Sequence, residues 1–216
     1  MAKKRKIPQT PSLARRKPQR EPKLKLVVVC EGEKTEPKYL NDFTRDHNNP
    51  LVEIKIIPKG GAPVTLVKKA LKFKKELERQ ARRSKNSFDQ RFQVWGLFDV
   101  DEHPNLAQAK DTARSNGVKL GISNPCFELW GLLHLRHYDA PIHRHDLQRL
   151  LEQLMPGYDH KLSATFNYKF IREHYDIAKK RAKQTCQRRE EEDDSGGNPS
   201  TDVYILLDFI IDNGKL

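Results

Sequence analysis

The stretch "VVVCEGEKTE", residues 27–36, decides both the fold and the chemistry of this chain. Its valines are typical of a strand that is buried on both faces. A glycine and Lys34 follow, but their spacing does not match the phosphate-binding pattern G-x-x-x-x-G-K-[ST]. The strand end instead carries Glu31, Glu33 and Glu36. Because carboxylates repel phosphate unless a divalent cation lies between them, the stretch predicts a metal-binding strand end.

The remaining strand signals place this stretch in a parallel sheet. Apolar or alternating runs bounded by turn residues predict strands at 24–30, 52–57, 92–98 and 118–123. Helical patterns separate them, and a β-α-β order of this kind predicts an α/β domain with an open parallel sheet flanked by helices. We expect that domain to cover residues 24–140. The strand signals then fade, which predicts a helical extension over 141–216 packed on the same domain.

Acidic residues recur where the third and fourth predicted strands end. Asp99 and Asp101 follow the third strand, and in an extended chain their side chains point the same way. Ligands of open parallel sheets bind outside the carboxyl ends of the strands. Together with Glu31, these side chains make an all-oxygen site suited to Mg²⁺ or Mn²⁺. A lone D-x-D is a weak signal, since it is also common in turns and helix caps.

The block "NPCFELWGLLHL", residues 124–135, predicts a helix that starts at Pro125 with Asn124 as its N-cap. Glu128 then falls in the first helical turn, close to the strand ends. Two roles stay open for it: a further ligand or water-positioning catalytic group, or the acid of a capping box. Cationic side chains near the predicted site are candidates for binding the phosphates of a nucleic acid. These candidates are Lys34, His103, Lys161 and Lys169.

The charge of the chain points to the same partner. Of a net charge of +12, residues 1–25 carry +9, with ten Lys or Arg and one acid. Several prolines interrupt this segment, so we predict a disordered basic arm over residues 1–23. Such an arm binds nucleic acid by electrostatic attraction, or it serves only as a solubilising tail.

The composition excludes several other classes of protein. The chain has 216 residues, enough for one substantial core. No apolar run approaches the roughly 20 residues of a membrane span, and no apolar signal-peptide segment follows the basic N-terminus. The three cysteines are scattered, which suits free thiols in a reducing compartment. We therefore expect a cytoplasmic protein without membrane partners.

Two features together carry a resemblance to a known family. A strand followed by E-G and a later strand followed by D-x-D resemble the Toprim pattern of topoisomerases, primases and some nucleases. Four blocks, "VVVCEGEKTEPKYL", "GLFDVDEH", "SNPCFELWGLLHL" and "GNPSTDVYILL", are similar to the RloB family, the Toprim-like component of phage-defence systems that act by abortive infection. The resemblance implies that Glu31, Asp99 and Asp101 are metal ligands. It also implies an ATPase partner encoded nearby, since this chain has no P-loop.

Two functions remain in competition on the sequence alone. The first is a Mg²⁺-dependent nuclease of Toprim type that cuts DNA or RNA in an anti-phage system. The alternative is a non-catalytic nucleic-acid-binding or toxin-scaffold protein with a structural or degenerate metal site. The acids at three strand ends favour the enzyme, while the lack of an evident general base keeps the alternative open. A homo-oligomer is compatible with either function.

Overall fold

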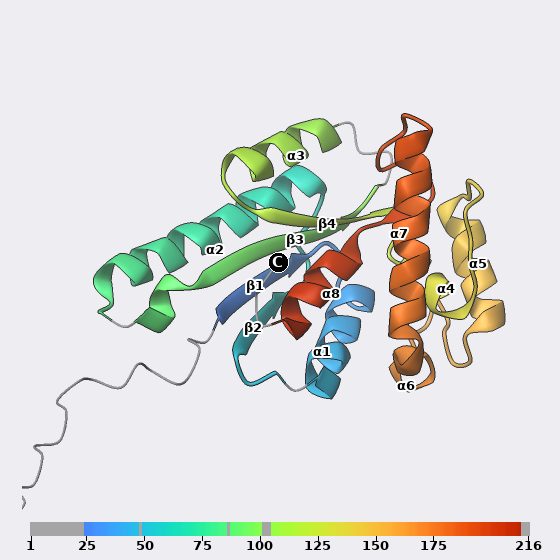
Figure 1. The fold of residues 1–216 in the computed structure, drawn as a ribbon, viewed down its shortest axis with the longest axis horizontal. Helices are drawn as coiled ribbons and strands as arrows, with labels where there is room; N and C mark the ends of the chain where they lie inside the picture. Colours follow the sequence, from blue (N-terminus) through green and yellow to red (C-terminus); the bar gives the residue numbers. More distant parts are fainter. Residues whose placement is uncertain (1–23, 48, 86, 101–104, 213–216) are drawn as a thin grey trace, which may run out of the picture.

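A five-stranded sheet in the order β2-β1-β3-β4-β5 forms the centre of the computed structural model (Figure 1). The structure describes residues 24–47, 49–85, 87–100 and 105–212. The predicted basic arm, Asp101 and His103 lie outside them. The elements are β1 (Leu24–Cys30), α1 (Thr35–His47), β2 (Val52–Ile57), α2 (Pro63–Arg83), η1 (Ser87–Gln90), β3 (Phe92–Asp99), α3 (Leu106–Ser115), β4 (Lys119–Asn124), α4 (Glu128–Leu135), α5 (Arg144–Leu154), α6 (Tyr168–Ile171), η2 (Arg172–His174), α7 (Tyr175–Glu191), β5 (Ser200–Thr201) and α8 (Val203–Ile211).

The alternation of side chains along β1 explains how the sheet is covered on both faces. Val27 and Val29 point into an apolar cluster beneath α2 and α3. Leu26 and Val28 point into the other cluster, to which α1, α4 and α8 contribute. Both faces of the central strand are therefore dry, as its run of valines predicts. The predicted α/β class with an open, mostly parallel sheet is confirmed.

The strands β1, β2, β3 and β4 run parallel, so their carboxyl ends meet at one edge of the sheet. In Figure 1 the helices α4, α5 and α7 stand beyond that edge, at the right of the view. α4 is buried along almost its whole length. The segment after residue 140 thus lies where ligands of such sheets bind. Within the described ranges, no helix has both the length and the apolar character needed to cross a membrane.

The strand β5 was not predicted. It is two residues long, runs antiparallel to β4 and pairs Thr201 with Ser123, whose hydroxyl groups lie 2.8 Å apart. The Asp202 carboxylate accepts a hydrogen bond of 2.6 Å from the N–H of Ile122. A strand this short has no periodicity to detect, and its polar residues are typical of loops. The helical extension therefore returns to the sheet as its last strand.

Candidate metal centre at the strand ends

Two of the predicted ligands meet at the ends of neighbouring strands. Glu31 follows β1 directly, and its N–H donates to the carbonyl of Leu97 in β3 at 2.9 Å. Asp99 ends β3, and its N–H donates to a carboxylate oxygen of Glu31 at 3.0 Å. Both side chains are half-buried. The parallel pairing of β1 with β3 therefore brings together two acids that lie 68 residues apart in sequence.

A third carboxylate, that of Glu36, lies beside this pair. It belongs to the first turn of α1, is only 6% exposed and accepts a hydrogen bond of 3.1 Å from the N–H of Gly32. A Cβ atom on residue 32 would lie 2.5 Å from a Glu36 oxygen, so glycine is required for this approach. Glu33 instead lies at the surface, 2.8 Å from Lys59. Of these two first-turn acids, Glu36 belongs to the site and Glu33 does not.

The electrostatics of the pair are unfavourable without a cation. Burial raises the pKa of Asp99 well above its ordinary value, and repulsion by Glu36, Glu128 and Glu31 raises it further. Burial also raises the pKa of Glu36, with Glu128 and Glu31 again contributing. Four carboxylates therefore lie close enough to repel one another.

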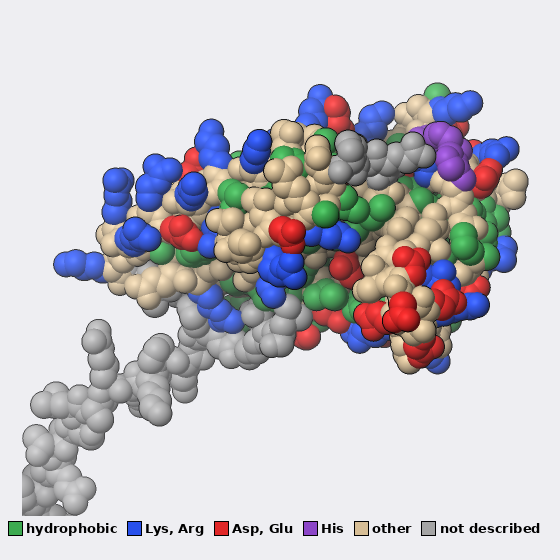
Figure 2. All heavy atoms as spheres, turned by 90° about the horizontal axis from the view of Figure 1, so that it is seen from above, with side chains coloured by type: hydrophobic (Ala, Val, Ile, Leu, Met, Phe, Trp, Pro, Cys, Tyr) green, Lys and Arg blue, Asp and Glu red, His purple; other side chains and the backbone are tan. Residues whose placement is uncertain are grey.

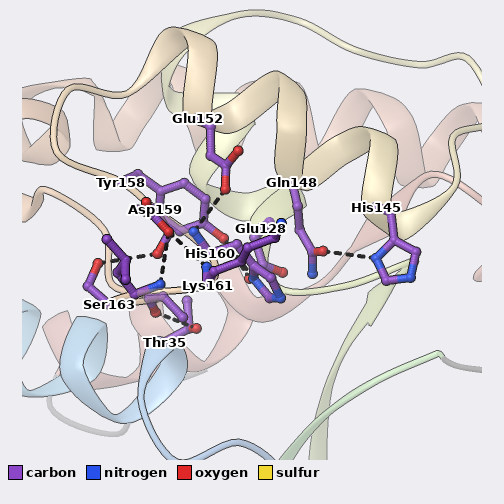
Figure 3. A network of polar contacts seen from close by, with 12 residues as sticks. Thr35, Glu128, His145, Gln148, Glu152, Tyr158, Asp159, His160, Lys161 and Ser163 are labelled. Carbon is purple, nitrogen blue, oxygen red and sulfur yellow. Dashed lines mark hydrogen bonds and ion pairs between the residues drawn. The ribbon is translucent and has the colours of Figure 1, made fainter.

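Glu128 is in a different situation, although it lies at the same edge. Its side chain is buried at the start of α4, where it accepts a hydrogen bond of 2.9 Å from the Tyr158 hydroxyl (Figure 3). His160 Nδ1 lies 3.6 Å from the same carboxylate. Burial alone would raise the pKa of Glu128, but its contacts with His160 and Cys126 and the hydrogen bond from Tyr158 hold it below its ordinary value. Its charge is thus stabilised by the protein itself.

Of the two roles left open for Glu128, the capping box with Asn124 is wrong. Asn124 is not an N-cap: it is the last residue of β4, pairs with Ser200, and its side chain donates to the Gly196 carbonyl at 2.9 Å. The helix begins only at Glu128, and Phe127, at the N-cap position, makes no capping hydrogen bond through its side chain. The unexpected strand β5 extends β4 by pairing, and this moves the start of the helix beyond Pro125.

The loop that supplies Tyr158 and His160 belongs to the helical extension. The Thr35 hydroxyl at the start of α1 donates to the carbonyl of Ala164 at 2.6 Å, which holds this loop against the site (Figure 3). The contact with the Glu128 carboxylate raises the pKa of His160. Neither residue was predicted, because an isolated His in a polar loop gives no signal of periodicity or spacing. The Pro156-Gly157 dipeptide is a turn signal, but it indicates neither Tyr158 nor His160 as part of a site.

The predicted phosphate-binding residues are separated. Lys34 is exposed in the segment between β1 and α1, three residues after Glu31, and Lys161 is exposed next to His160 in the chain. Lys169 is exposed on α6 and lines a different hollow of about 460 Å³, together with Arg45 of α1. Two of these lysines are therefore close in sequence to residues of the site, and the third lines a different hollow.

The donor set fits a hard divalent cation. Glu31, Asp99 and Glu36 offer only oxygen atoms and repel one another, and a cation between them would remove that repulsion. In the described part of the chain, no three His, Cys, Asp or Glu side chains are already arranged to hold a metal ion. The predicted ligand Asp101 lies outside that part.

Comparison with known families identifies the family to which the chain belongs. The family model described as "RloB-like protein" matches residues 26–210, which is most of the chain. The chain belongs to the RloB-like family. The match spans the sheet, the site and the helical segment, so the RloB-like family shares more than the strand-end motifs. No curated protein and no solved structure matches the chain.

Proposed function

We propose that this RloB-like protein is a Mg²⁺- or Mn²⁺-dependent nuclease of Toprim type, which hydrolyses phosphodiester bonds of DNA or RNA. The observation that carries the proposal is the arrangement of Glu31 and Asp99. They lie on adjacent strand ends, joined by a hydrogen bond of 3.0 Å, in a field of further carboxylates that raises the pKa of Asp99. A protein keeps such a costly cluster where a cation and the substrate phosphate offset its charge.

The proposal gives each residue a distinct task. Glu31, Asp99 and Asp101 hold the cation. When bound, the cation activates a water molecule and neutralises charge on the phosphate and the leaving oxygen. Glu36 adds negative charge behind them and orders the turn at Gly32 through its hydrogen bond.

Glu128 was predicted as a catalytic residue, and its contacts suggest a more specific role. Its Oε1 accepts the hydrogen bond from Tyr158 and lies near His160, so this oxygen is already engaged within the protein. We assign it the positioning of His160 next to the strand ends. Lys34 and Lys161 are exposed and close in sequence to Glu31 and His160, where they can contact the phosphates of a bound strand.

The biological setting is also part of the proposal. The resemblance of the RloB-like family to Toprim components of abortive-infection systems suggests an anti-phage effector in the cytoplasm. An ATPase encoded nearby would then supply the nucleotide chemistry for which this sequence has no P-loop.

A cleavage assay tests the proposed activity. The full chain is incubated with labelled duplex DNA, single-stranded DNA, messenger RNA and transfer RNA, in Mg²⁺, in Mn²⁺ and in EDTA. We expect cleavage of at least one substrate in Mg²⁺ or Mn²⁺ and none in EDTA. Cleavage that persists in EDTA would contradict the metal-dependent mechanism. Mg²⁺-dependent stabilisation with no cleavage would favour the scaffold protein with a structural metal.

A further inference from the structure

The solvent face of α2 carries a straight line of cations. Five exposed Lys and Arg side chains follow one another at alternate spacings of four and three residues. On an α-helix this spacing keeps side chains on one stripe, here on the side opposite the residues that pack on the sheet. Figure 2 shows several Lys and Arg side chains at the left of the view, the end of the molecule toward which α2 extends in Figure 1. The α2 stripe consists of Lys68, Lys72, Lys75, Arg79 and Arg82.

The charge of the α2 stripe is only partly offset on its own helix. The two acids of α2 are Glu76 and Glu78; Glu78 pairs at 2.7 Å with Lys74, which lies off the stripe, and attracts Arg82 and Lys75 without an ion-pair contact. Across the described ranges, no ion pair joins a stripe residue to a carboxylate. The stripe therefore presents a net positive surface to solvent.

The other long basic helix, α7, shows that this arrangement is not a general property of the chain. Lys179 of α7 lies 2.7 Å from Asp208. Arg188 pairs with Asp139, and Arg189 lies 2.8 Å from Glu192. Lys179 and Arg188 of α7 thus join elements of the fold, whereas the cations of the α2 stripe make no ion-pair contact with a carboxylate in the described part of the chain.

The dimensions and composition of the α2 stripe suit a duplex. From Lys68 to Arg82 the helix rises about 21 Å, at 1.5 Å per residue. This length spans about six phosphates of one duplex strand at 3.4 Å per step. Proteins that hold single strands stack bases on exposed aromatic rings. The one aromatic residue of α2, Phe73, instead packs against a core cluster and lies 5.1 Å from Lys55 Nζ.

The α2 stripe also points toward the carboxylates. Just before α2 begins, the N–H of Gly60 donates to the carbonyl of Cys30 at 2.7 Å, next to Glu31. α2 then runs back along the sheet, away from the strand ends (Figure 1). A duplex that lies along the stripe therefore reaches the site with one end.

We propose that the α2 stripe binds the phosphate backbone of a nucleic-acid duplex and aligns it with the strand-end site. The choice of a nucleic acid as partner rests on the proposed function. The contact itself requires no metal and no cleavage, so it can be measured separately.

The test compares two triple variants of the full chain that lose the same charge. One variant carries Lys72→Gln, Lys75→Gln and Arg79→Gln on the α2 stripe. The control carries Lys180→Gln, Lys183→Gln and Arg188→Gln at exposed positions of α7. Binding of a short labelled duplex, as DNA and as RNA, is measured by fluorescence anisotropy in EDTA over a series of salt concentrations. Thermal melts establish that each variant is folded.

We expect the stripe variant to bind duplex at least about tenfold more weakly than wild type at low salt. The slope of log K against log salt should become shallower by about 2.7, which corresponds to three lost phosphate contacts. The α7 control should stay within about twofold of wild type, because its charges lie away from the contact. An unchanged stripe variant, or equal losses in the two variants, would overturn the proposal.

Two further arms identify the partner. A single strand that binds more tightly than the duplex would overturn the choice of a duplex. The choice of a duplex would also be overturned if the stripe variant lost binding to phosphatidylserine vesicles but still bound the duplex. The stripe would then be a membrane-binding surface. Weak binding by the stripe variant, with no cleavage by wild type in Mg²⁺, would leave the stripe standing and remove the nuclease. Cleavage by wild type together with unchanged duplex binding by the stripe variant would support the nuclease and overturn the role of the stripe.

Discussion

Asp99 and Glu128 lie at the same edge of the sheet, yet the pKa values of their carboxyl groups are shifted in opposite directions. Asp99 meets other acids, and its pKa is raised. Glu128 is more buried, but Tyr158 and His160 contact it and its pKa is lowered. The difference shows that burial alone does not decide the charge of a carboxylate. The partners supplied by the fold decide it: acids around Asp99 raise its pKa despite the opposing charge of Arg144, whereas the partners of Glu128 lower its pKa.

The largest effect is expected from Asp99→Asn, which removes one of the carboxylate charges that repel one another at the strand ends. Cleavage should fall well over tenfold, at a cost of about 2 kcal/mol or more to the transition state. Stability in EDTA should stay level or rise, because one repelling charge is gone. Melts in EDTA and in Mg²⁺, together with cleavage rates, measure both effects.

A matched control for this variant is Asp111→Asn, at an exposed acid of α3 that pairs with Arg114. It should keep both the activity and the stabilisation by Mg²⁺. Equal Mg²⁺ stabilisation of wild type and Asp99→Asn would remove Asp99 from the site.

The isosteric change Glu128→Gln should act with the opposite sign on stability. It removes a stabilised charge from beside His160 and Tyr158, so the metal-free protein should lose about 1–3 kcal/mol. Because Glu128 is not assigned as a ligand, stabilisation by Mg²⁺ should persist. Urea unfolding in EDTA, repeated with Mg²⁺, measures both quantities. A Glu128→Gln protein that is more stable than wild type would show that the charge of Glu128, like that of Asp99, destabilises the metal-free protein.

The pH dependence of stability sharpens the same comparison. As the pH falls from about 8 to about 5, metal-free protein should become more stable, by up to about 1.4 kcal/mol per pH unit for each group. Asp99 and Glu36 have raised pKa values, so the folded chain takes up protons while the unfolded carboxyls stay ionised. Asp202, whose pKa burial raises to about 6, acts in the same direction. The stabilising contact of His160 with Glu128 is present at low pH and is lost as the pH rises through the raised pKa of His160.

Saturating Mg²⁺ should flatten only the part of this dependence that comes from the strand-end carboxylates. Melting temperatures over that pH range, with EDTA and with Mg²⁺, provide the measurement. Stability of the metal-free protein that rises with pH would contradict the assigned directions.

Deletion of residues 1–22 is expected to have the smallest effect on the strand-end site that contains Asp99 and Glu128. The charge of this segment predicts weaker nucleic-acid binding and a flatter salt dependence. The melt and its Mg²⁺ shift should stay as in wild type, since the proposed ligands are untouched. Binding titrations at several salt concentrations would show the change. Unaltered binding with the same salt slope would make the segment a tail without that role.

The sequence predicts the sheet well because its signals are local. The valines of β1 and the alternation of β2 determine strands by composition alone, and parallel connections then place Glu31 near Asp99. Tyr158 and His160 could not be predicted, because their role depends on a loop held by long-range hydrogen bonds, from Thr35 to Ala164 and from Tyr158 to Glu128. The start of α4 was missed for a similar reason, since β5 is visible only in three dimensions.

The return of the chain to β4 has a consequence for folding kinetics. The hydrogen bond from Ile122 to Asp202 closes a loop of 80 residues, and such a closure costs entropy before any contact offsets it. Contacts of this range slow folding. Ser123, next to Asp99 in the sheet, finds its partner Thr201 only when that closure is made. We therefore expect the edge that carries the acids to be among the late regions to become ordered during refolding, after the contacts between β1 and its neighbours.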